Sequence, residues 1–600
     1  MYLLFGSLAL VYFAYKVLTS VLPNYLIVPP TNWQDKIKTV IEYSKPIYLQ
    51  VGHKRSSYRR RLVLASSQPS FYTNYVNNKL KVCPSDYNED FLTEMRRRDV
   101  NDPNRRILYG FFHPYANNGG GGERVLWQAV KATLVADQKN IAVIYTTNTD
   151  AEPLDILKKA EEKFQITDLD SRRVLFVYLR RFGHLIDGQY WKRLTMVGQL
   201  WGAALLALEA MFELSPDVWI DTIGLPGSYI PALWILKVPI LAYVHYPIIQ
   251  NDMFNKLKFK HLKDIIGARS VGDVKDAAKL IYWSALYYFY TYLGSLVDIV
   301  LTNGTWTYNH LESIFVLNRG IGNKMEILYP PCGTENLPLS APNAPKENKL
   351  LYIAQFRPEK RHLLILNEYH QFLSKFKQSK SPIKELPTIV FLGSCRTSDD
   401  TATLVSVKNR VAELELTEYV EFVVDCSYDE VVEWLAKAKF GLNGMWNEHF
   451  GIGVVEYLGR VIPLCHASAG PYLDIVTPWA KDKQEQDWYN DTGFFFKSEL
   501  DPDFDPSIQV AEDENLVFEY QDKKLEFPSF SNLLTRLFIT NRELISEDIL
   551  AEMRSNGALL VLEKFSNKTF DVQWMKYIGA LETLEKTYRE DKRPRVEQVH

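Results

Sequence analysis

The chain has 600 residues, of which 46% are apolar, and this is more than one hydrophobic core organises. We therefore expect two domains of Rossmann size with additional segments. The charge is nearly balanced, with 69 basic and 72 acidic residues, so the total charge gives no general attraction to nucleic acid. The five cysteines are scattered and lack metal-binding spacing, which favours reduced thiols and no zinc site.

The N-terminal residues 2–28 contain a single charged side chain, Lys16, and are long enough to span a hydrocarbon core of about 30 Å. The positive charge follows the apolar run, which favours an uncleaved membrane anchor at residues 1–30 over a cleaved signal peptide. A basic juxtamembrane and lead-in segment is expected at residues 31–100. Its first part, residues 31–61, holds eight lysines and arginines against two acids, which the positive-inside rule places in the cytosol with the catalytic body.

Three other features bear on the membrane. Sequons at Asn303, Asn490 and Asn567 would suit a lumenal domain, but such triplets are frequent by chance and the thiols carry more weight. The apolar stretches 196–208 and 280–300 are interpreted as buried helices rather than membrane spans. Residues 254–263 interleave lysines with aromatic and aliphatic residues, which suits either an anionic membrane surface or a solvated loop.

Short β-rich apolar runs alternate with helical patterns, which is typical of parallel sheets covered by helices on both faces. The predicted fold class is therefore α/β, with two Rossmann-like domains at residues 101–300 and 301–570. Six strands are expected in the first domain, at 107–113, 141–147, 174–179, 218–223, 240–246 and 298–303. Five are expected in the second, at 350–356, 389–394, 419–424, 440–444 and 461–465.

The C-terminal third contains an acid-rich insertion at about 481–527, which we expect to be largely irregular. A helical pattern follows from about residue 533 to 584. Residues 571–600 are predicted to form a C-terminal helix with a frayed tail.

The segment YGFFHPYANNGGGGERVLW leads from a strand into a helix that begins near Glu123. Glycines allow the backbone to approach a ligand closely, and the first turn of a helix offers unpaired N–H groups. A run of glycines is often only a tight turn, but this context favours a ligand-binding loop. The four glycines of the turn are Gly119, Gly120, Gly121 and Gly122.

Two further strand ends carry candidate residues. His245, in YVHYP, closes an apolar strand at the edge where α/β proteins bind ligands, although a hydrogen-bonded core histidine fits equally well. In LLYIAQFRPEK, a strand leads into a helix through Arg357 and Lys360. Cations fixed there suit a diphosphate, although basic residues in an exposed first turn are common.

The segment NEHFGIGVVEYLGR carries the most specific pattern, the glutamates Glu448 and Glu456 eight residues apart. Gly451 and Gly453 precede a helix expected at 454–458, so a positive helix end would lie between two carboxylates. One glutamate could address a sugar and the other a ribose diol. Surface glutamates are common, so the pair is informative only in this context.

The segment EHFGIGVVE resembles the E-x7-E element of the GT4 family of retaining GT-B glycosyltransferases. HPYANNGGGGERVLW, YVHYP, AQFRPEK, NEHFGIGVVE and SAGPYLDIV occur in the order typical of that family. Together they are similar to its eukaryotic members that transfer α-1,2-linked mannose from GDP-mannose during dolichol-oligosaccharide assembly. The resemblance covers residues 106–493 and the N-terminal anchor.

The resemblance implies a GT-B fold, in which two Rossmann-like domains with parallel sheets face a central cleft. It places Glu448 against the donor sugar and Glu456 at the nucleotide ribose. The backbone that would cradle the sugar and phosphate belongs to Phe450, Gly451, Ile452 and Gly453.

The resemblance also implies that His245 approaches the reacting sugar and that the glycine-rich loop helps to close the site. Many family members have an arginine where this chain has Gln355. Lys360 is therefore the expected diphosphate ligand, with Arg357 as a substitute. Glu448, His245 and Lys360 are the expected catalytic residues.

The implied reaction transfers mannose from GDP-mannose, with retention, to the dolichol-pyrophosphate-linked trimannosyl chitobiose core, two mannoses in succession. No metal or other cofactor is expected. The expected partners are GDP-mannose, the lipid-linked acceptor, the membrane and other transferases of the same pathway, at the cytosolic face of the endoplasmic reticulum. Two alternatives stay open: a related transferase that uses a UDP-sugar, and an inactive nucleotide-sugar-binding subunit.

Overall fold

The structure is a computed structural model. It describes residues 2–22, 47–49, 80–82, 107–250, 253–254, 257–259, 270–320, 324–336, 339, 344–379, 381–382, 385–395, 397–480, 486–509, 515–520 and 523–597. The chain divides into two compact units. Unit 1 comprises residues 1–303, 307–328 and 570–600, and unit 2 comprises residues 304–306 and 329–569.

Unit 1 is built on a seven-stranded parallel sheet in the order β5-β4-β3-β6-β7-β8-β9. Six strands lie where the apolar pattern predicted them. The seventh, β9, is short, and its side chains alternate between exposed and half-buried, so it lacks the continuous apolar run of its neighbours. The strands are β3 (Ile107–Phe112), β4 (Asn140–Thr146), β5 (Val174–Tyr178), β6 (Val218–Asp221), β7 (Ile240–Val244), β8 (Ile299–Thr302) and β9 (Lys324–Ile327).

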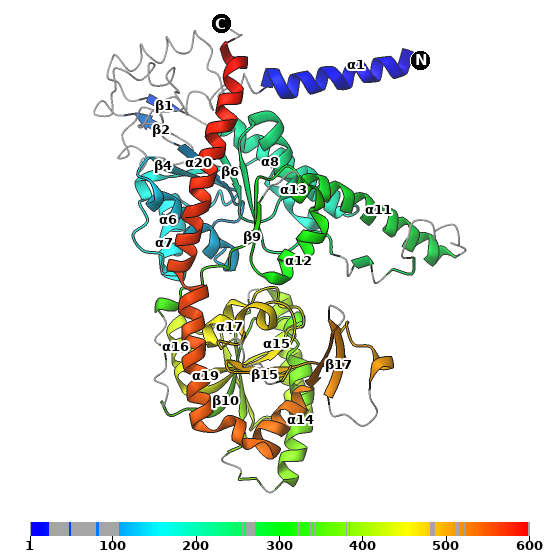
Figure 1. Cartoon of the computed structure of the whole chain (residues 1–600), viewed down its shortest axis with the longest axis vertical. Coiled ribbons are helices and arrows are strands. Elements are labelled where there is room, and N and C mark those ends of the chain that lie inside the picture. The colour runs from blue at the N-terminus through cyan, green and yellow to red at the C-terminus, as the bar shows by residue number, and fades with distance from the viewer. Residues whose placement is uncertain are drawn as a thin grey trace. The chain divides into compact units, whose positions relative to one another are not determined.

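Helices cover both faces of this sheet (Figure 1). Successive strand residues point to opposite faces, so Phe111 and Phe112 of β3 enter different core clusters. One face is covered by α8 (Thr195–Glu213), η8 (Ala232–Leu236), α11 (Val271–Gly294) and the end of α12 (Thr305–Ile314). The other is covered by α6 (Gly121–Ala136), α7 (Pro153–Phe164) and α20 (Asn567–Glu597).

The C-terminal helix α20 belongs to the core of unit 1 from Phe570 onward. Trp574 is completely buried, and its indole N–H donates to the Thr133 hydroxyl at 2.8 Å. Gln128 donates to the Asp571 carboxylate at 2.7 Å. The first half of α20 is therefore anchored to α6 by packing and polar contacts.

Among the described residues, α8 is the helix that is long and apolar enough to cross a membrane by length and composition. Half of its apolar window is buried, and Leu206, Ala207 and Ala210 are completely buried in the core. This supports the interpretation of residues 196–208 as a core helix.

At the N-terminus, α1 (Tyr2–Lys16) continues into η1 (Val17–Val21). Residues 2–21 would extend about 30 Å at the usual rise of about 1.5 Å per residue, close to the thickness of a hydrocarbon core. The apolar side chains from Leu8 to Tyr15 are exposed in the structure, whereas Leu22 packs against the core of unit 1. Within residues 31–61 the structure describes only the strand β1 (Ile47–Leu49), so all eight basic residues of this segment lie outside the described part.

The lysine-rich segment 254–263 is only partly described. Leu257 and Phe259 are buried in a small cluster with Leu280 of α11, so these two side chains are unavailable to a membrane. Lys258 forms an ion pair with Asp273 at 2.6 Å. Lys256, Lys260 and Lys263 lie outside the described residues.

Unit 2 is built on a second seven-stranded sheet in the order β12-β11-β10-β13-β14-β16-β15. All neighbours are parallel except β15 and β16. The five predicted strands are confirmed within a few residues, as β10 (Glu347–Ile353), β11 (Thr388–Gly393), β12 (Val420–Val424), β13 (Ala438–Asn443) and β14 (Ile462–His466). The helices are α14 (His362–Gln378), α15 (Ser398–Glu413), α16 (Tyr428–Lys437), α17 (Ile452–Tyr457), α18 (Phe530–Thr535) and α19 (Glu547–Leu560).

The expectation of a largely irregular insertion at 481–527 is wrong for much of its described part. It contributes β15 (Tyr489–Asn490) and β16 (Gly493–Phe496) to the sheet, and β17 (Asn515–Tyr520) pairs with β18 (Lys523–Pro528). The acidic composition concealed the apolar run of β16, whose residues are all buried.

The sequons have internal structural roles. Asn303 and Asn490 are 6% and 5% exposed. Asn303 accepts a hydrogen bond from Thr307, and Asn490 donates to the Val476 carbonyl. The Asn567 side chain accepts the N–H of Gly333. These contacts oppose glycosylation of the folded chain.

Among the described residues, the four cysteines Cys332, Cys395, Cys426 and Cys465 are free.

A buried histidine at the start of α14 reduces stability at acid pH. His362 is 2% exposed, and neither ring nitrogen has a hydrogen-bond partner. Its ring packs against Tyr352, Phe356 and Phe391. Burial, followed by the nearby Lys360 charge, lowers the pKa of His362 to about 4.

We expect His362→Phe to raise the stability of unit 2 and to weaken its acid sensitivity. The unfolded histidine has a pKa of about 6.5, whereas the folded histidine has a pKa of about 4. Between these pH values the unfolded chain binds a proton that the folded chain does not bind, so wild-type stability falls as the pH drops from about 6.5 to about 4. The advantage of the variant should grow by at most about 1.4 kcal/mol per pH unit across that window. Thermal unfolding midpoints of both proteins at pH 7.5 and 5.5 measure it. An advantage that is equal at both pH values would contradict the assignment.

Candidate functional site

The order of the strands in unit 2 places a topological switch point between β10 and β13. The chain passes from β10 outward to β11 and β12, and then returns to place β13 on the other side of β10. Connections that diverge from two adjacent parallel strands leave an opening at the carboxyl edge, where α/β proteins bind ligands. Lys360 follows β10 and Glu448 follows β13, so both predicted residues lie at this switch point.

The structure brings Lys360 and Glu448 into direct contact. The Lys360 ammonium forms an ion pair with the Glu448 carboxylate and lies 3.1 Å from the Met445 sulfur. The side chains of Lys360 and Glu448 are 20% and 17% exposed, so both remain accessible. Arg357 instead donates to Asp400 at 3.3 Å, and its side chain is 40% exposed. This geometry favours Lys360 over Arg357 as the diphosphate ligand.

The loop that carries Glu448 has an unusual backbone. Asn447 has a φ of 61° and Gly451 a φ of 103°, both in the left-handed region that favours asparagine and glycine. The Glu448 carbonyl accepts the N–H of Gly470 at 2.9 Å. Phe450 is 5% exposed, and its ring stacks on Tyr329. The loop is therefore held on both sides of the glutamate.

The helix after this loop, α17, begins at Ile452 rather than at residue 454 and has only six residues. Gly453 therefore lies inside the first turn instead of before it. A helix this short has a small dipole, so the fixed charge of Lys360 is the stronger candidate for stabilising a diphosphate. Glu456 is half-buried on α17. Burial lowers the pKa of Arg460 to about 10, against the opposing effect of the nearby Glu456 charge.

Two residues that the sequence analysis missed support this loop. Trp306 stacks on His449, the neighbour of Glu448, with ring centres 4.3 Å apart. Asp474, at 1% exposure, accepts hydrogen bonds from the backbone and hydroxyl of Thr305 and from the Tyr329 hydroxyl. The segment SAGPYLDIV contains Asp474, but its spacing alone gave no sign of these partners.

Unit 1 has a corresponding switch point between β3 and β6. His113 follows β3, Thr222 follows β6 and His245 follows β7. His113 Nδ1 lies 2.8 Å from the Thr222 hydroxyl, and His113 Nε2 lies 3.4 Å from the Glu123 carboxylate. His245 Nε2 lies 3.1 Å from the Thr222 carbonyl. The other Glu123 oxygen accepts the N–H of Gly120 at 2.5 Å and caps α6.

The glycine-rich turn lies against these histidines. Gly119 has a φ of 79°. A Cβ atom on Gly122 would lie 3.5 Å from His245 Nε2 and 4.0 Å from His113 Cε1. Of the four glycines Gly119, Gly120, Gly121 and Gly122, the last therefore lies against His245, and α6 begins at Gly121.

The hydrogen bonds determine the protonation of His245. The Thr222 carbonyl only accepts, so His245 carries its proton on Nε2 and presents Nδ1 as an acceptor. Burial lowers the pKa of His245 to about 4, against the opposing effect of this hydrogen bond. The imidazole is therefore neutral at physiological pH.

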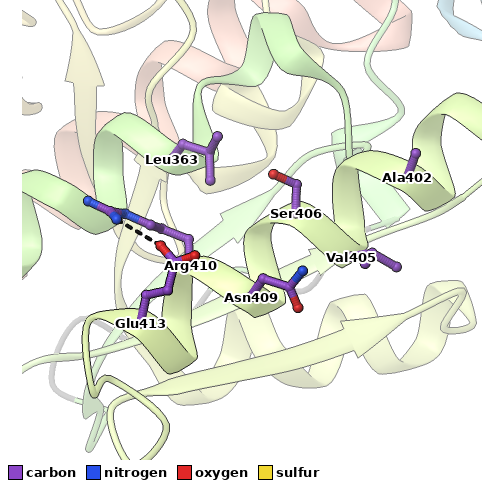
Figure 2. Close-up of a pocket in the computed structure, with 7 residues that line it drawn as sticks. All are labelled: Leu363, Ala402, Val405, Ser406, Asn409, Arg410 and Glu413. Atoms are coloured by element: carbon purple, nitrogen blue, oxygen red, sulfur yellow. Dashed lines mark hydrogen bonds and ion pairs between the residues drawn. The ribbon is translucent and has the colours of Figure 1, made fainter.

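A shallow hollow of about 340 Å³ lies elsewhere in unit 2, between α14 and α15 (Figure 2). It is lined by Leu363 of α14 and by α15 residues that include Val405, Asn409 and the ion pair of Arg410 with Glu413. It contains none of the predicted site residues. No cluster of three or more metal-binding side chains occurs within the described ranges.

Two Rossmann-like units, each with candidate site residues at the switch point of its sheet, have the architecture of a glycosyltransferase of the GT-B class. Sucrose-phosphate synthase from Thermosynechococcus elongatus has this fold, with a TM-score of 0.50 and 13% identity over 79% of this chain and 99% of that one. The Glycosyl transferases group 1 family matches residues 335–512, and the family described as ALG11 mannosyltransferase N-terminus matches residues 106–315.

Full-length relatives define the family more narrowly. The GDP-Man:Man(3)GlcNAc(2)-PP-Dol alpha-1,2-mannosyltransferase of Debaryomyces hansenii is 59% identical over 98% of this chain and 97% of its own length. Proteins of the same name match from Candida albicans, at 57% identity over 100% of both chains, and from Homo sapiens, at 35% over 66% of this chain and 78% of that protein. The chain belongs to this family of alpha-1,2-mannosyltransferases, which confirms the resemblance drawn from its motifs.

Proposed function

We propose that this protein transfers mannose from GDP-mannose to the dolichol-pyrophosphate-linked Man(3)GlcNAc(2) core, forming α-1,2 linkages with retention of configuration. The full-length similarity to enzymes named for this donor and acceptor supports the substrates. The Lys360–Glu448 pair at the switch point of unit 2 is the observation that carries the chemistry. We further propose two successive mannose additions and no obligatory metal.

In the proposed reaction, the bond between the mannose C1 and the GDP oxygen breaks, and negative charge develops on the diphosphate. Lys360 stabilises that charge in the transition state, with Arg357 contributing less because Asp400 holds it. Glu448 binds the sugar hydroxyls, and the backbone from Phe450 to Gly453 lines the donor. The acceptor hydroxyl attacks the same face of the sugar and gives its proton to the departing diphosphate oxygen.

His245 contributes as a neutral hydrogen-bond acceptor in this proposal. Its Nδ1 accepts from a hydroxyl of the reacting sugar, because Nε2 is committed to Thr222. The glycine-rich turn at 119–122 lies beside this ring, since a Cβ atom on Gly122 would be in van der Waals contact with His245 Nε2.

The proposed location is the endoplasmic reticulum membrane, with both units on the cytosolic side. Residues 1–30 form the anchor, which the apolar helix α1 supports, and residues 31–61 supply the basic flank. Unit 1 is proposed to serve the acceptor, and unit 2 the nucleotide sugar.

A direct assay tests this function. The purified protein is incubated with radiolabelled GDP-mannose, UDP-glucose or UDP-N-acetylglucosamine and a dolichol-linked trimannosyl core. We expect label transfer from GDP-mannose alone, with a product sensitive to α-1,2-mannosidase. Transfer from a UDP-sugar would support the related-transferase alternative. Donor binding without any transfer would support the inactive-subunit alternative.

Glu456→Ala should mainly weaken donor binding. If Glu456 binds the ribose, the apparent KM for GDP-mannose should rise about tenfold or more, while kcat changes little. GDP affinity and melting temperature are measured on the same preparation. Arg460→Lys is the matched control, since it perturbs the charged neighbour of Glu456 without removing the carboxylate. Normal GDP affinity in a folded Glu456→Ala protein would remove the ribose assignment.

A further inference from the structure

A carboxylate from the acid-rich stretch is buried against Arg361, the residue that follows Lys360. The Asp501 side chain is completely buried and accepts three hydrogen bonds. They come from the Arg361 guanidinium at 2.6 Å, the His466 Nε2 at 2.8 Å and the Ser498 backbone N–H at 2.9 Å. A buried carboxylate with this many partners is rigidly placed.

The hydrogen bonds continue from Asp501 to the loop that carries Glu448. The Ser468 hydroxyl oxygen accepts the Asn447 backbone N–H at 2.8 Å and lies 2.9 Å from His466 Nδ1. Burial lowers the pKa of His466, so the ring is neutral, and because its Nε2 donates to Asp501, its Nδ1 accepts the Ser468 hydroxyl hydrogen. His466 is completely buried and donates from Nε2 to Asp501. With the hydrogens placed in this way, the Asn447 N–H, the Ser468 hydroxyl and both His466 nitrogens each have a hydrogen-bond partner in a continuous chain that ends at Asp501.

The two ends of this chain are adjacent in sequence to the two members of the ion pair. Arg361 directly follows Lys360, and Asn447 directly precedes Glu448. Both end residues have left-handed backbones, with φ values of 58° for Arg361 and 61° for Asn447. Such conformations in non-glycine residues persist where surrounding contacts hold them. Asp501 therefore supports the turn on each side of the candidate catalytic pair.

We propose that Ser468, His466 and Asp501 are positioning residues for mannosyl transfer, which hold the Lys360 and Glu448 turns in register across the β10–β13 switch point. This inference rests on the proposed function and extends it to residues that touch neither donor nor acceptor. It also assigns a role to the acid-rich stretch: it supplies the carboxylate that joins the two turns.

The test is a double-mutant cycle with Ser468→Ala, which removes one hydroxyl from a half-buried position. We expect kcat for transfer from GDP-mannose to fall about tenfold, the size of one lost hydrogen bond, with a melting temperature close to that of wild type. Ser468→Thr, which keeps the hydroxyl, should recover most of the rate. In a Glu448→Ala background, Ser468→Ala should have no further effect, because no carboxylate remains to be positioned.

Asp501→Asn provides the second variant, with Glu499→Gln as the matched control, because Glu499 is an exposed acid of the same stretch. Asp501→Asn should lower kcat and also lose its effect in the Glu448→Ala background, while Glu499→Gln should behave as wild type. Losses that multiply fully with Glu448→Ala, or a normal kcat in folded Ser468→Ala, would overturn the inference. Absence of mannosyl transfer by the wild-type protein would instead overturn the proposed function.

Discussion

Glu448→Ala is expected to lower kcat for mannosyl transfer by about a hundredfold or more, the usual loss when one polar contact to a reacting centre is removed. Its affinity for GDP should be unchanged or slightly higher. The reason is that the Glu448 carboxylate pairs with Lys360 in the structure, and its removal leaves the ammonium available to the diphosphate. Single-turnover rates and calorimetric GDP binding on the same preparation measure the two effects.

Glu448→Gln is the matched variant, because it keeps the shape and loses the charge. A rate close to wild type in Glu448→Gln would show that the carboxylate charge is unimportant. A tenfold loss of GDP affinity in Glu448→Ala, with normal melting temperature, would move this residue from the sugar to the nucleotide part of the site.

Lys360→Ala is expected to reduce kcat by about a hundredfold or more and also to weaken GDP binding. The ammonium is the fixed cation at the end of β10, and charge on the leaving diphosphate increases in the transition state, so its contribution grows as the bond breaks. The ratio of kcat to KM for GDP-mannose and the Kd for GDP measure the two losses.

Arg357→Ala is the matched control for Lys360→Ala, because both cations lie in the same turn. Arg357 is more exposed and is already paired with Asp400, so its removal should cost less than about fivefold. Equal losses in the two variants would show that Arg357 shares the diphosphate. The double variant Lys360→Ala, Glu448→Ala should be little worse than the more damaged single variant, since the two side chains act together.

The strands of both sheets could be predicted because each buried parallel strand needs an apolar run that is visible locally. The eleven predicted strands correspond to β3 to β8 and β10 to β14. The strands that escaped prediction are β9, with charged residues on a half-exposed edge, and β15 and β16, inside an acidic stretch. The two-residue β15 and the partly charged β9 depend on their pairing partners, whereas β16 has a buried apolar run that the surrounding acidic residues concealed.

The sequence predicted which candidate residues lie at the ends of strands. It did not predict which side chains they contact. Lys360 and Glu448 are 88 positions apart, and only the crossover that places β10 beside β13 brings them together. The same applies to His113 and Thr222, which meet because β3 lies beside β6. Glycine turns and cations next to strands are local signals, but a hydrogen bond between distant turns leaves no local signature.

The sequence by itself determined the α/β class, the family and the residue types at the strand ends, because burial and turn chemistry act over a few neighbouring residues. The tertiary structure decided which cation faces Glu448 and that Asp501 is an internal support rather than part of a solvated acidic loop. It also decided which nitrogen of His245 can accept a hydrogen bond. Each of these depends on distances between side chains that are far apart in the chain, and strand order, not local composition, sets those distances.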